Sequence, residues 1–168
     1  VKDLLVQRPI QYIIRKAFFR SLTLKVNENV LIPRQETEEL VNWVIEDFRG
    51  NPNKNKMIDI GTGSGGIAIS LAKELKNNMI YGLDNDDTIL DLAKQNSKNN
   101  NVYVNFFRKD INFLNSLNLK IDVVVSNPPY VLQEEKKNMR LNVLDYEPHK
   151  AIFVDEEDPL KFYRLILD

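Results

Sequence analysis

The chain contains a short stretch, Asn127-Pro128-Pro129-Tyr130, whose groups suit the handling of a planar nitrogen. An amide or adenine amino nitrogen is a poor nucleophile because its lone pair is delocalised. The Asn127 side-chain oxygen and the Pro128 carbonyl can accept its two N–H protons, while Tyr130 can stack on the planar group. Since the prolines stiffen the turn, we expect Asn127, Pro128 and Tyr130 to act in catalysis and all four residues to bind substrate. A structural proline turn with a capping asparagine is the alternative.

A glycine-rich turn, Gly61-Thr62-Gly63-Ser64-Gly65, precedes this stretch, and Asp59 lies two residues before its first glycine. Glycine is needed where a ligand touches bare backbone, and free amides at a helix start favour an anionic group. Asp84 comes 19 residues after Gly65, where an acid can accept hydrogen bonds from both ribose hydroxyls. The G-x-G-x-G order differs from the nicotinamide fingerprint and resembles the S-adenosylmethionine turn of class I methyltransferases. A plain strand-to-helix turn is the alternative.

Two further residues, Asp110 and Ile111, follow the third predicted strand. Asp110 can accept a hydrogen bond from the exocyclic amine of adenine, and Ile111 can pack on its ring. The alternative for Asp110 is a helix N-cap. We expect both residues, together with the glycine turn and Asp84, to bind an adenosine-type cofactor.

These residues need rigid elements to position them, and the apolar pattern supplies strands that alternate with helices. The strands are predicted at 57–60, 79–83, 102–107 and 121–126, and the helices at 67–75, 88–98 and 113–117, with a last helix capped by Asp158 and Pro159 at its first position. This alternation predicts an α/β fold with a parallel sheet and crossover helices. Ligands bind at the carboxyl ends of such strands, where the residues described above lie.

An upstream segment, residues 1–50, is predicted to precede the S-adenosylmethionine-binding catalytic domain at 51–168. The boundary lies in the polar stretch 49–56. Strands are expected at 18–26 and 30–32 around an Asn27-Glu28-Asn29 turn. A helix follows Pro33, with Leu40, Val41, Val44, Ile45 and Phe48 on one face.

The composition limits the possible functions. The 168 residues are 43% hydrophobic, and 23 basic residues nearly balance 24 acidic ones, which argues against a dedicated duplex-binding domain. The absence of cysteine excludes disulfides and thiolate sites, and the single histidine, His149, has no neighbours at metal-ligand spacing, so we expect no metal. No apolar run could cross a bilayer and no signal peptide opens the chain, so we expect a cytoplasmic location.

Four blocks together resemble the HemK/PrmC family of peptide chain release factor glutamine methyltransferases. They are Arg8-Pro9-Ile10-Gln11-Tyr12-Ile13-Ile14, the Leu31-Ile32-Pro33-Arg34-Gln35-Glu36-Thr37-Glu38 block, the glycine turn with Asn-Pro-Pro-Tyr, and Tyr146-Glu147-Pro148-His149-Lys150-Ala151 followed by Asp158-Pro159-Leu160. The second block carries the resemblance, because DNA and RNA amino-methyltransferases share Asn-Pro-Pro-Tyr. The resemblance implies a Rossmann-like class I methyltransferase fold, preceded here by a short β-hairpin.

The resemblance also implies partners for the candidate residues. Residues Gly61 to Gly65, Asp84, Asp110, Ile111 and Asn127 would contact S-adenosylmethionine. Residues Asn127 to Tyr130 would hold the glutamine of a release factor's Gly-Gly-Gln motif, and Arg34, Glu36 and Glu38 would line the site. A helix-start cap is the alternative for these last three.

The chain departs from that family in several places. Arg15 occupies a position where the family usually has glycine. The chain lacks an initiating methionine and ends inside a predicted helix, so we expect a fragment that stops before the last strands of the fold. Glutamine methylation of a ribosomal protein, N6-adenine methylation of DNA or RNA, and a non-catalytic cofactor-binding module remain alternatives. A nicotinamide oxidoreductase fits the glycine spacing least.

Overall fold

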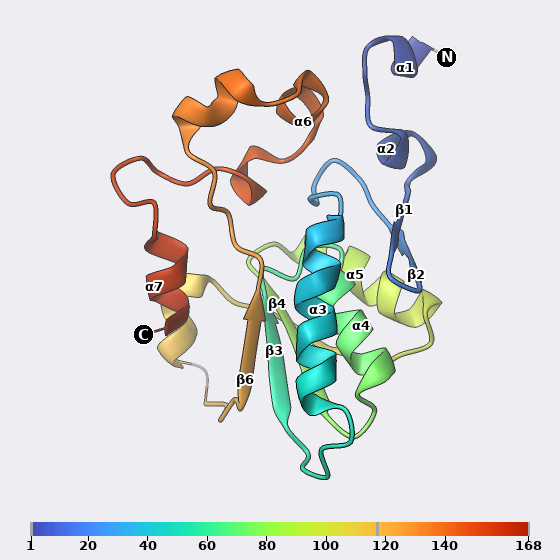
Figure 1. Cartoon of the computed structure of the whole chain (residues 1–168), viewed down its shortest axis with the longest axis vertical. Helices are drawn as coiled ribbons and strands as arrows, with labels where there is room; N and C mark the ends of the chain where they lie inside the picture. Colours follow the sequence, from blue (N-terminus) through green and yellow to red (C-terminus); the bar gives the residue numbers. More distant parts are fainter. Residues whose placement is uncertain (1, 117, 168) are drawn as a thin grey trace.

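The computed structural model describes residues 2–116 and 118–167, which form an α/β fold around a parallel sheet (Figure 1). Within these residues the sheet has four strands in the order β5-β4-β3-β6. Their bounds are β3 Lys56–Ile60, β4 Met79–Asp84, β5 Asn105–Arg108 and β6 Val123–Ser126. The predicted α/β fold with a parallel sheet is confirmed.

Crossover helices determine the strand order. Helix α4 (Gly66–Glu74) connects β3 to β4, and α5 (Asp87–Asn99) connects β4 to β5. The chain then passes through the 3-10 helix η1 (Ile111–Ser116) and places β6 on the other side of β3. Ile60 pairs with Leu83 on one side and with Ser126 on the other, so the carboxyl ends of three strands lie together. The strand order reverses between β3 and β6, which is where open α/β sheets bind ligands.

Both faces of the sheet are covered, which explains why its strands are continuous apolar runs (Figure 1). Helices α3 (Gln35–Phe48) and α4 pack on one face, with Val41 and Leu71 fully buried between them and the sheet. Helix α7 (Lys161–Leu167) and η1 pack on the other face through Ile166 and Leu114. All five residues predicted to face inward from α3 belong to or pack against the first cluster: Leu40, Val41, Val44, Ile45 and Phe48.

The predicted upstream strands are wrong in position. The hairpin consists of β1 (Lys16–Phe19) and β2 (Leu22–Lys25), which pair antiparallel and turn at Arg20-Ser21. Arg20 adopts a left-handed backbone with φ 51°. The chain therefore reverses at Arg20 and not at the Asn27-Glu28-Asn29 segment, whose residue types favour a turn. Residues 30–32 are not a strand. Val30 is buried in a loop, where its carbonyl accepts a hydrogen bond from Tyr12 Oη at 2.7 Å.

The hairpin packs directly on the sheet's helices. Its inward residues Phe19, Leu22 and Leu24 are fully buried in the cluster that also contains Val41 of α3 and Leu71 of α4. The division of the chain near residue 50 stays a prediction.

Other element boundaries shift by a few residues from their predicted positions. Two strands are shorter than predicted, since β5 begins at Asn105 and β6 at Val123. The helix predicted at 113–117 is the 3-10 helix η1, and Leu117 lies outside the described residues. Helix α7 begins at Lys161, whose N–H donates to the Asp158 carbonyl at 3.2 Å. Asp158 and Pro159 therefore form the turn that precedes the helix.

The remaining elements lie before β1 or between β6 and α7. They are α1 Lys2–Leu5, α2 Ile10–Ile14, η2 Gln133–Asn138, α6 Leu141–Tyr146 and η3 His149–Ala151. Arg15 caps α2 in the left-handed conformation at φ 55°. Glycine adopts this conformation without steric cost, so the geometry fits the glycine that the resembled family usually has where Arg15 stands.

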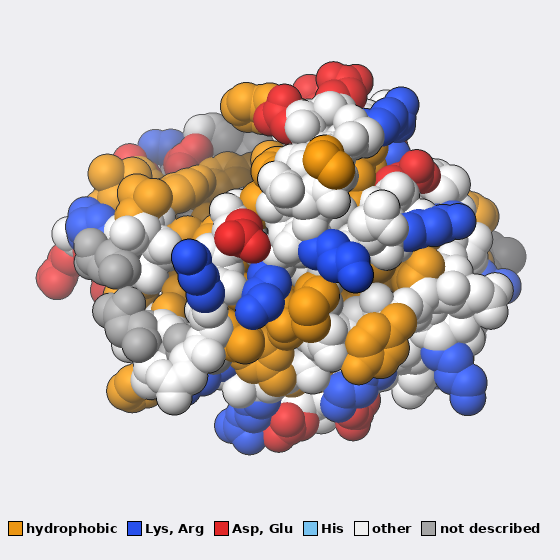
Figure 2. All heavy atoms as spheres, turned by 90° about the horizontal axis from the view of Figure 1, so that it is seen from below, with side chains coloured by type: hydrophobic (Ala, Val, Ile, Leu, Met, Phe, Trp, Pro, Cys, Tyr) orange, Lys and Arg blue, Asp and Glu red, His pale blue; other side chains and the backbone are white. Residues whose placement is uncertain are grey.

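The end of the molecule that carries the amino ends of the strands has a mixed surface. Figure 2 shows basic, acidic and apolar side chains interspersed on this face. Proteins that bind duplexes usually gather Lys and Arg into one positively charged patch. The mixed charges seen on this face do not form such a patch.

Candidate active site

A cavity of about 350 Å³ lies at the carboxyl ends of β3, β4 and β6, where the strand order reverses. Segments far apart in the sequence meet around it. Of the sequence-predicted site residues, its lining includes Arg34, Gly61, Thr62, Gly63, Ser64, Asp84, Ile111, Asn127, Pro128 and Pro129. The lining does not include Glu36, Gly65, Asp110 or Tyr130. The cavity therefore brings the glycine turn, the acid at the end of β4 and the Asn-Pro-Pro segment together.

The glycine turn is held against the end of β4 by backbone hydrogen bonds. The N–H groups of Gly61 and Thr62 both donate to the Leu83 carbonyl, at 2.9 and 2.8 Å. Gly63 faces the cavity with φ 53°, and Gly65 has φ 86° at the start of α4. A Cβ on Gly65 would lie 2.8 Å from Ile69 Cδ1. Gly65 therefore serves close helix packing, whereas Gly63 exposes backbone to the cavity.

Asp59 stabilises this turn through hydrogen bonds of its side chain. Its side chain is fully buried, and Oδ2 accepts hydrogen bonds from Thr62 Oγ1 at 2.7 Å and from the Ala68 N–H at 3.2 Å. Oδ1 has no hydrogen-bond partner among the described residues. Burial raises the pKa of Asp59 from 3.8 to about 7, and the nearby Asp84 carboxylate adds to the shift. The sequence placed Asp59 in the motif but gave it no role.

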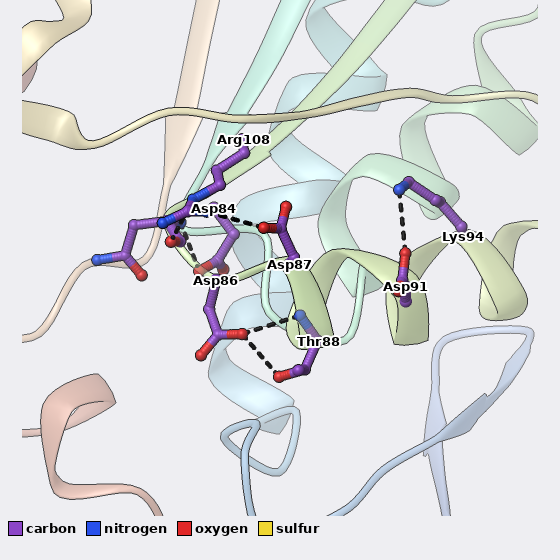
Figure 3. A network of polar contacts seen from close by, with 8 residues as sticks. Asp84, Asp86, Asp87, Thr88, Asp91, Lys94 and Arg108 are labelled. Atoms are coloured by element: carbon purple, nitrogen blue, oxygen red, sulfur yellow. Dashed lines mark hydrogen bonds and ion pairs between the residues drawn. The ribbon is translucent and has the colours of Figure 1, made fainter.

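Asp84 is fixed by backbone amides at the end of β4 (Figure 3). Its Oδ2 accepts from the Gly63 N–H at 3.0 Å, and its Oδ1 accepts from the Asn85 N–H at 2.9 Å. Desolvation by burial raises the pKa of the Asp84 carboxyl. Because each carboxylate oxygen has a second lone pair, both oxygens can accept another hydrogen bond from a ligand in the cavity.

Asp86, two residues after Asp84, caps α5 (Figure 3). Asp86 Oδ1 accepts from the Thr88 N–H at 2.9 Å and from Thr88 Oγ1 at 2.6 Å, while Lys150 Nζ donates to Asp86 Oδ2 at 3.2 Å. The hydrogen bonds from Thr88 lower the pKa of Asp86 to about 2. The cavity-lining Lys150 is thereby held against the first turn of α5.

The Asn-Pro-Pro-Tyr stretch begins where β6 ends. Ser126 Oγ donates to the Ile60 carbonyl at 2.7 Å, which fixes the start of the segment to β3. Asn127 Nδ2 donates to Thr37 Oγ1 at 3.2 Å, and Pro128 is buried. Tyr130 lies outside the lining with 59% of its surface exposed, and its N–H donates to the Ile152 carbonyl at 3.3 Å. The structure therefore brings Asn127 and the prolines to the cavity, but not the Tyr130 side chain.

The upstream block contributes Arg34, which forms an ion pair with a nearly buried acid. Arg34 Nη2 lies 2.6 Å from Glu147 Oε1, and the Ile32 N–H donates to Glu147 Oε2 at 3.1 Å. The Glu147 side chain is only 2% exposed. The other acids of the block point elsewhere, since Glu36 is exposed and Glu38 accepts from the Arg20 N–H at 2.9 Å.

Asp110 and Ile111 have different environments. Ile111 lines the cavity. Asp110 Oδ1 accepts from the N–H and the Nδ2 of Asn112, at 2.9 and 2.7 Å, and these bonds lower the pKa of Asp110. This is the capping geometry that was the alternative for Asp110.

Several lining residues were missed at the level of sequence. Thr37 and Lys150 lie inside blocks that carried the family resemblance, so the blocks themselves were the available signal. Phe162 of α7 and Asn85 had no such signal, because only the fold brings them to the cavity. Groups of three or more His, Cys, Asp or Glu that could hold a metal are absent from the part of the chain that the structure describes. In the same part, no helix combines the length and apolarity needed to span a membrane.

Comparison with known protein families assigns the chain to one of them. The family described as "Methyltransferase small domain" matches residues 37–145, which include the glycine turn, Asp84 and the Asn-Pro-Pro-Tyr stretch. The chain belongs to the methyltransferase small domain family.

Relatives of this methyltransferase domain support the resemblance found in the motifs. A release factor glutamine methyltransferase of Flavobacterium psychrophilum is 51% identical over 164 residues, which cover 96% of this chain and 58% of the relative. One of Bacteroides thetaiotaomicron is 44% identical over 95% of this chain and 57% of its own length. The predicted family resemblance is confirmed. The chain spans somewhat more than half the length of these curated relatives.

Solved structures support the methyltransferase fold independently. The catalytic domain of hMettl16, in complex with an RNA hairpin, matches with a TM-score of 0.63 and 22% identity over 87% of this chain and 55% of that one. The Pyrococcus abyssi tRNA (uracil-54, C5)-methyltransferase, in complex with S-adenosyl-L-homocysteine, matches with a TM-score of 0.56 and 16% identity over 90% of this chain and 37% of that one. The predicted Rossmann-like methyltransferase fold is confirmed.

Proposed function

We propose that this protein transfers a methyl group from S-adenosylmethionine to the side-chain N5 nitrogen of a protein glutamine. The proposed substrate is the glutamine of the Gly-Gly-Gln motif of a peptide chain release factor. One observation carries the proposal: Asn127 and Pro128 line the same cavity as Gly63 and Asp84. The names of the curated relatives support the choice of a release factor as the protein partner.

The cavity suits S-adenosylmethionine at three points. Asp84 would accept hydrogen bonds from the ribose hydroxyls, and Gly63 exposes backbone to the cavity. Ile111 supplies an apolar surface for the base. Thr62 and Ser64 complete the turn. Gly65 and Asp110 lie outside the cavity lining and would support cofactor binding indirectly, Gly65 by fixing the turn and Asp110 by fixing the start of η1. When bound, the cofactor supplies a methyl group activated by a positively charged sulfur.

The Asn-Pro-Pro-Tyr stretch is proposed to hold the glutamine carboxamide. The Asn127 side-chain oxygen and the Pro128 carbonyl would accept the two N–H protons of the substrate amide, with Asn127 also beside the cofactor. Pro129 keeps the turn stiff. Tyr130, which is exposed next to this turn, would cover the planar amide once substrate is bound. Arg34 in the lining and Glu36 near it are proposed to contact the substrate chain.

The reaction needs orientation more than a strong base. The amide nitrogen would form a bond to the methyl carbon as the carbon–sulfur bond breaks, which would leave S-adenosylhomocysteine, and the nitrogen would then release a proton to water. Hydrogen bonds from the two N–H groups fix the nitrogen and increase its electron density as positive charge develops. Fixed geometry and oriented dipoles of this kind account for much of the rate enhancement of enzymes.

We further propose a cytoplasmic location, in keeping with a substrate of the translation machinery.

Methyl transfer from labelled S-adenosylmethionine tests this function. Purified release factor, ribosomal proteins and DNA are offered in parallel to the protein expressed from its complete reading frame. We expect label on release factor, and a loss of at least about a hundredfold in Asn127→Ala because the amide loses its side-chain acceptor. Asn53→Ala, an exposed asparagine in the loop before β3, is the matched control and should keep full activity. Label on DNA alone would overturn the proposed substrate.

A further inference from the structure

The first turn of α3 places a hydroxyl group in the wall of the cavity. Thr37 is half-buried and lines the cavity, and its Oγ1 accepts the hydrogen bond from Asn127 Nδ2 at 3.2 Å. The two residues are 90 positions apart in the chain. Among the described residues this is the hydrogen bond that the Asn127 carboxamide makes.

This hydrogen bond joins the Nδ2 end of the Asn127 carboxamide to Thr37 of α3. A carboxamide has an acceptor oxygen on one side and a donor NH2 group on the other. With Nδ2 directed to Thr37, Oδ1 is left on the opposite side as an acceptor. A flipped amide would direct its own N–H groups toward the N–H groups of a substrate amide. Two donors facing each other cannot form a hydrogen bond, so only one of the two orientations can hold the substrate.

The position of Thr37 is fixed by the packing of its helix. Val41 and Ile45 of α3 are buried in the main core, one and two turns after Thr37. The Thr37 N–H also donates to the Arg34 carbonyl at 3.2 Å, at the start of the helix. A β-branched side chain has few accessible rotamers in a helix, which further restricts the hydroxyl. The acceptor for Asn127 is therefore held by a rigid element.

We propose that Thr37 is a positioning residue that holds the Asn127 carboxamide with its oxygen toward the substrate nitrogen. This inference rests on the proposed function, since it assigns a role within that reaction. Thr37 itself does not touch the reacting atoms. Its loss should therefore lower the rate of methyl transfer more than it weakens the binding of either substrate.

Steady-state kinetics of three variants test the proposal in the protein expressed from its complete reading frame, with release factor and labelled S-adenosylmethionine. Thr37→Val keeps the shape but removes the hydroxyl, and we expect kcat to fall about tenfold or more while both KM values change less than about threefold. Thr37→Ser restores the acceptor and should return kcat to within about threefold of the wild type. Thr23→Val, on the exposed face of β2, is the matched control and should leave kcat unchanged.

The outcomes separate this inference from the proposed function. A Thr37→Val variant with the kcat of the active wild type would overturn the role of Thr37 and leave the function intact. Equal losses in Thr37→Val and Thr37→Ser that follow a lowered melting temperature would also overturn it, because they would assign Thr37 a structural role only. A wild-type protein that does not methylate glutamine would overturn the proposed function and this inference with it.

Discussion

The buried carboxyl group of Asp59 should make the folded protein less stable as the pH rises. Burial raises the pKa of Asp59 from 3.8 to about 7. The folded state therefore binds this proton more tightly than the unfolded chain does. The resulting stabilisation is complete below the unfolded pKa and is lost as the pH rises through the folded pKa. A shift of about three pKa units corresponds to about 4 kcal/mol of unfolding free energy.

Urea unfolding of the wild type and of Asp59→Asn, measured from about pH 4.5 to about pH 8, isolates this contribution. Asparagine does not titrate and keeps an oxygen for Thr62 Oγ1 and the Ala68 N–H. Because most other titrating groups cancel in the comparison, the wild type should lose up to about 3 kcal/mol relative to the variant over this range, the rest of the contribution being lost below about pH 4.5. Asp91→Asn, at an exposed aspartate of α5, controls for the loss of a surface charge.

A difference between wild type and Asp59→Asn that stays constant within about 0.5 kcal/mol across the range would refute the reasoning. It would mean that Asp59 binds its proton equally in the folded and unfolded states. A difference that grows in favour of the wild type at high pH would also contradict it, because it would require a lowered pKa.

Two further predictions concern the cavity and its wall. Asp84→Asn should weaken S-adenosylmethionine binding about tenfold or more by isothermal titration calorimetry, because a charged acceptor for the ribose is lost; unchanged affinity would exclude Asp84 as the ribose ligand, and Asp91→Asn serves as its control. Glu147→Gln should destabilise the protein by about 2 kcal/mol in urea unfolding, because the Arg34 charge loses its partner and the amide NH2 group must face one of the two donors, Arg34 Nη2 or the Ile32 N–H. An unchanged midpoint would contradict this.

Much of the fold could be predicted because its signals are local. Alternating apolar runs and helical stripes predicted the parallel sheet, and the α3 stripe from Leu40 to Phe48 packs as expected. The hairpin was misplaced because its turn, Arg20-Ser21, contains only a serine as a turn-favouring residue, whereas the segment at 27–29 contains two asparagines. Val30 and Ile32 are apolar because they are buried in a loop, and a sequence pattern alone does not distinguish this from a strand.

Part of the candidate site could be predicted because several of its residues lie at the ends of predicted strands. Gly63, Asp84 and Asn127 each lie at or just after the carboxyl end of a strand, so the sheet topology alone brings them to one edge. Asp110 and Tyr130 also lie near strand ends, but neither side chain reaches the cavity. The Asp110 carboxylate accepts hydrogen bonds from Asn112, and the Tyr130 side chain is exposed. Residue spacing in the sequence does not predict either side-chain orientation. Thr37 and Lys150 enter the lining from other segments through tertiary packing.

The position of the transferred methyl group tests the central claim most directly. A release factor incubated with the protein and S-adenosylmethionine is digested and mapped by tandem mass spectrometry. The account predicts one added methyl group on the side-chain nitrogen of the Gly-Gly-Gln glutamine, formed at least about a hundredfold more slowly when Asn127→Ala replaces the wild type. A methyl group found only on other residue types, and on no glutamine, would contradict it.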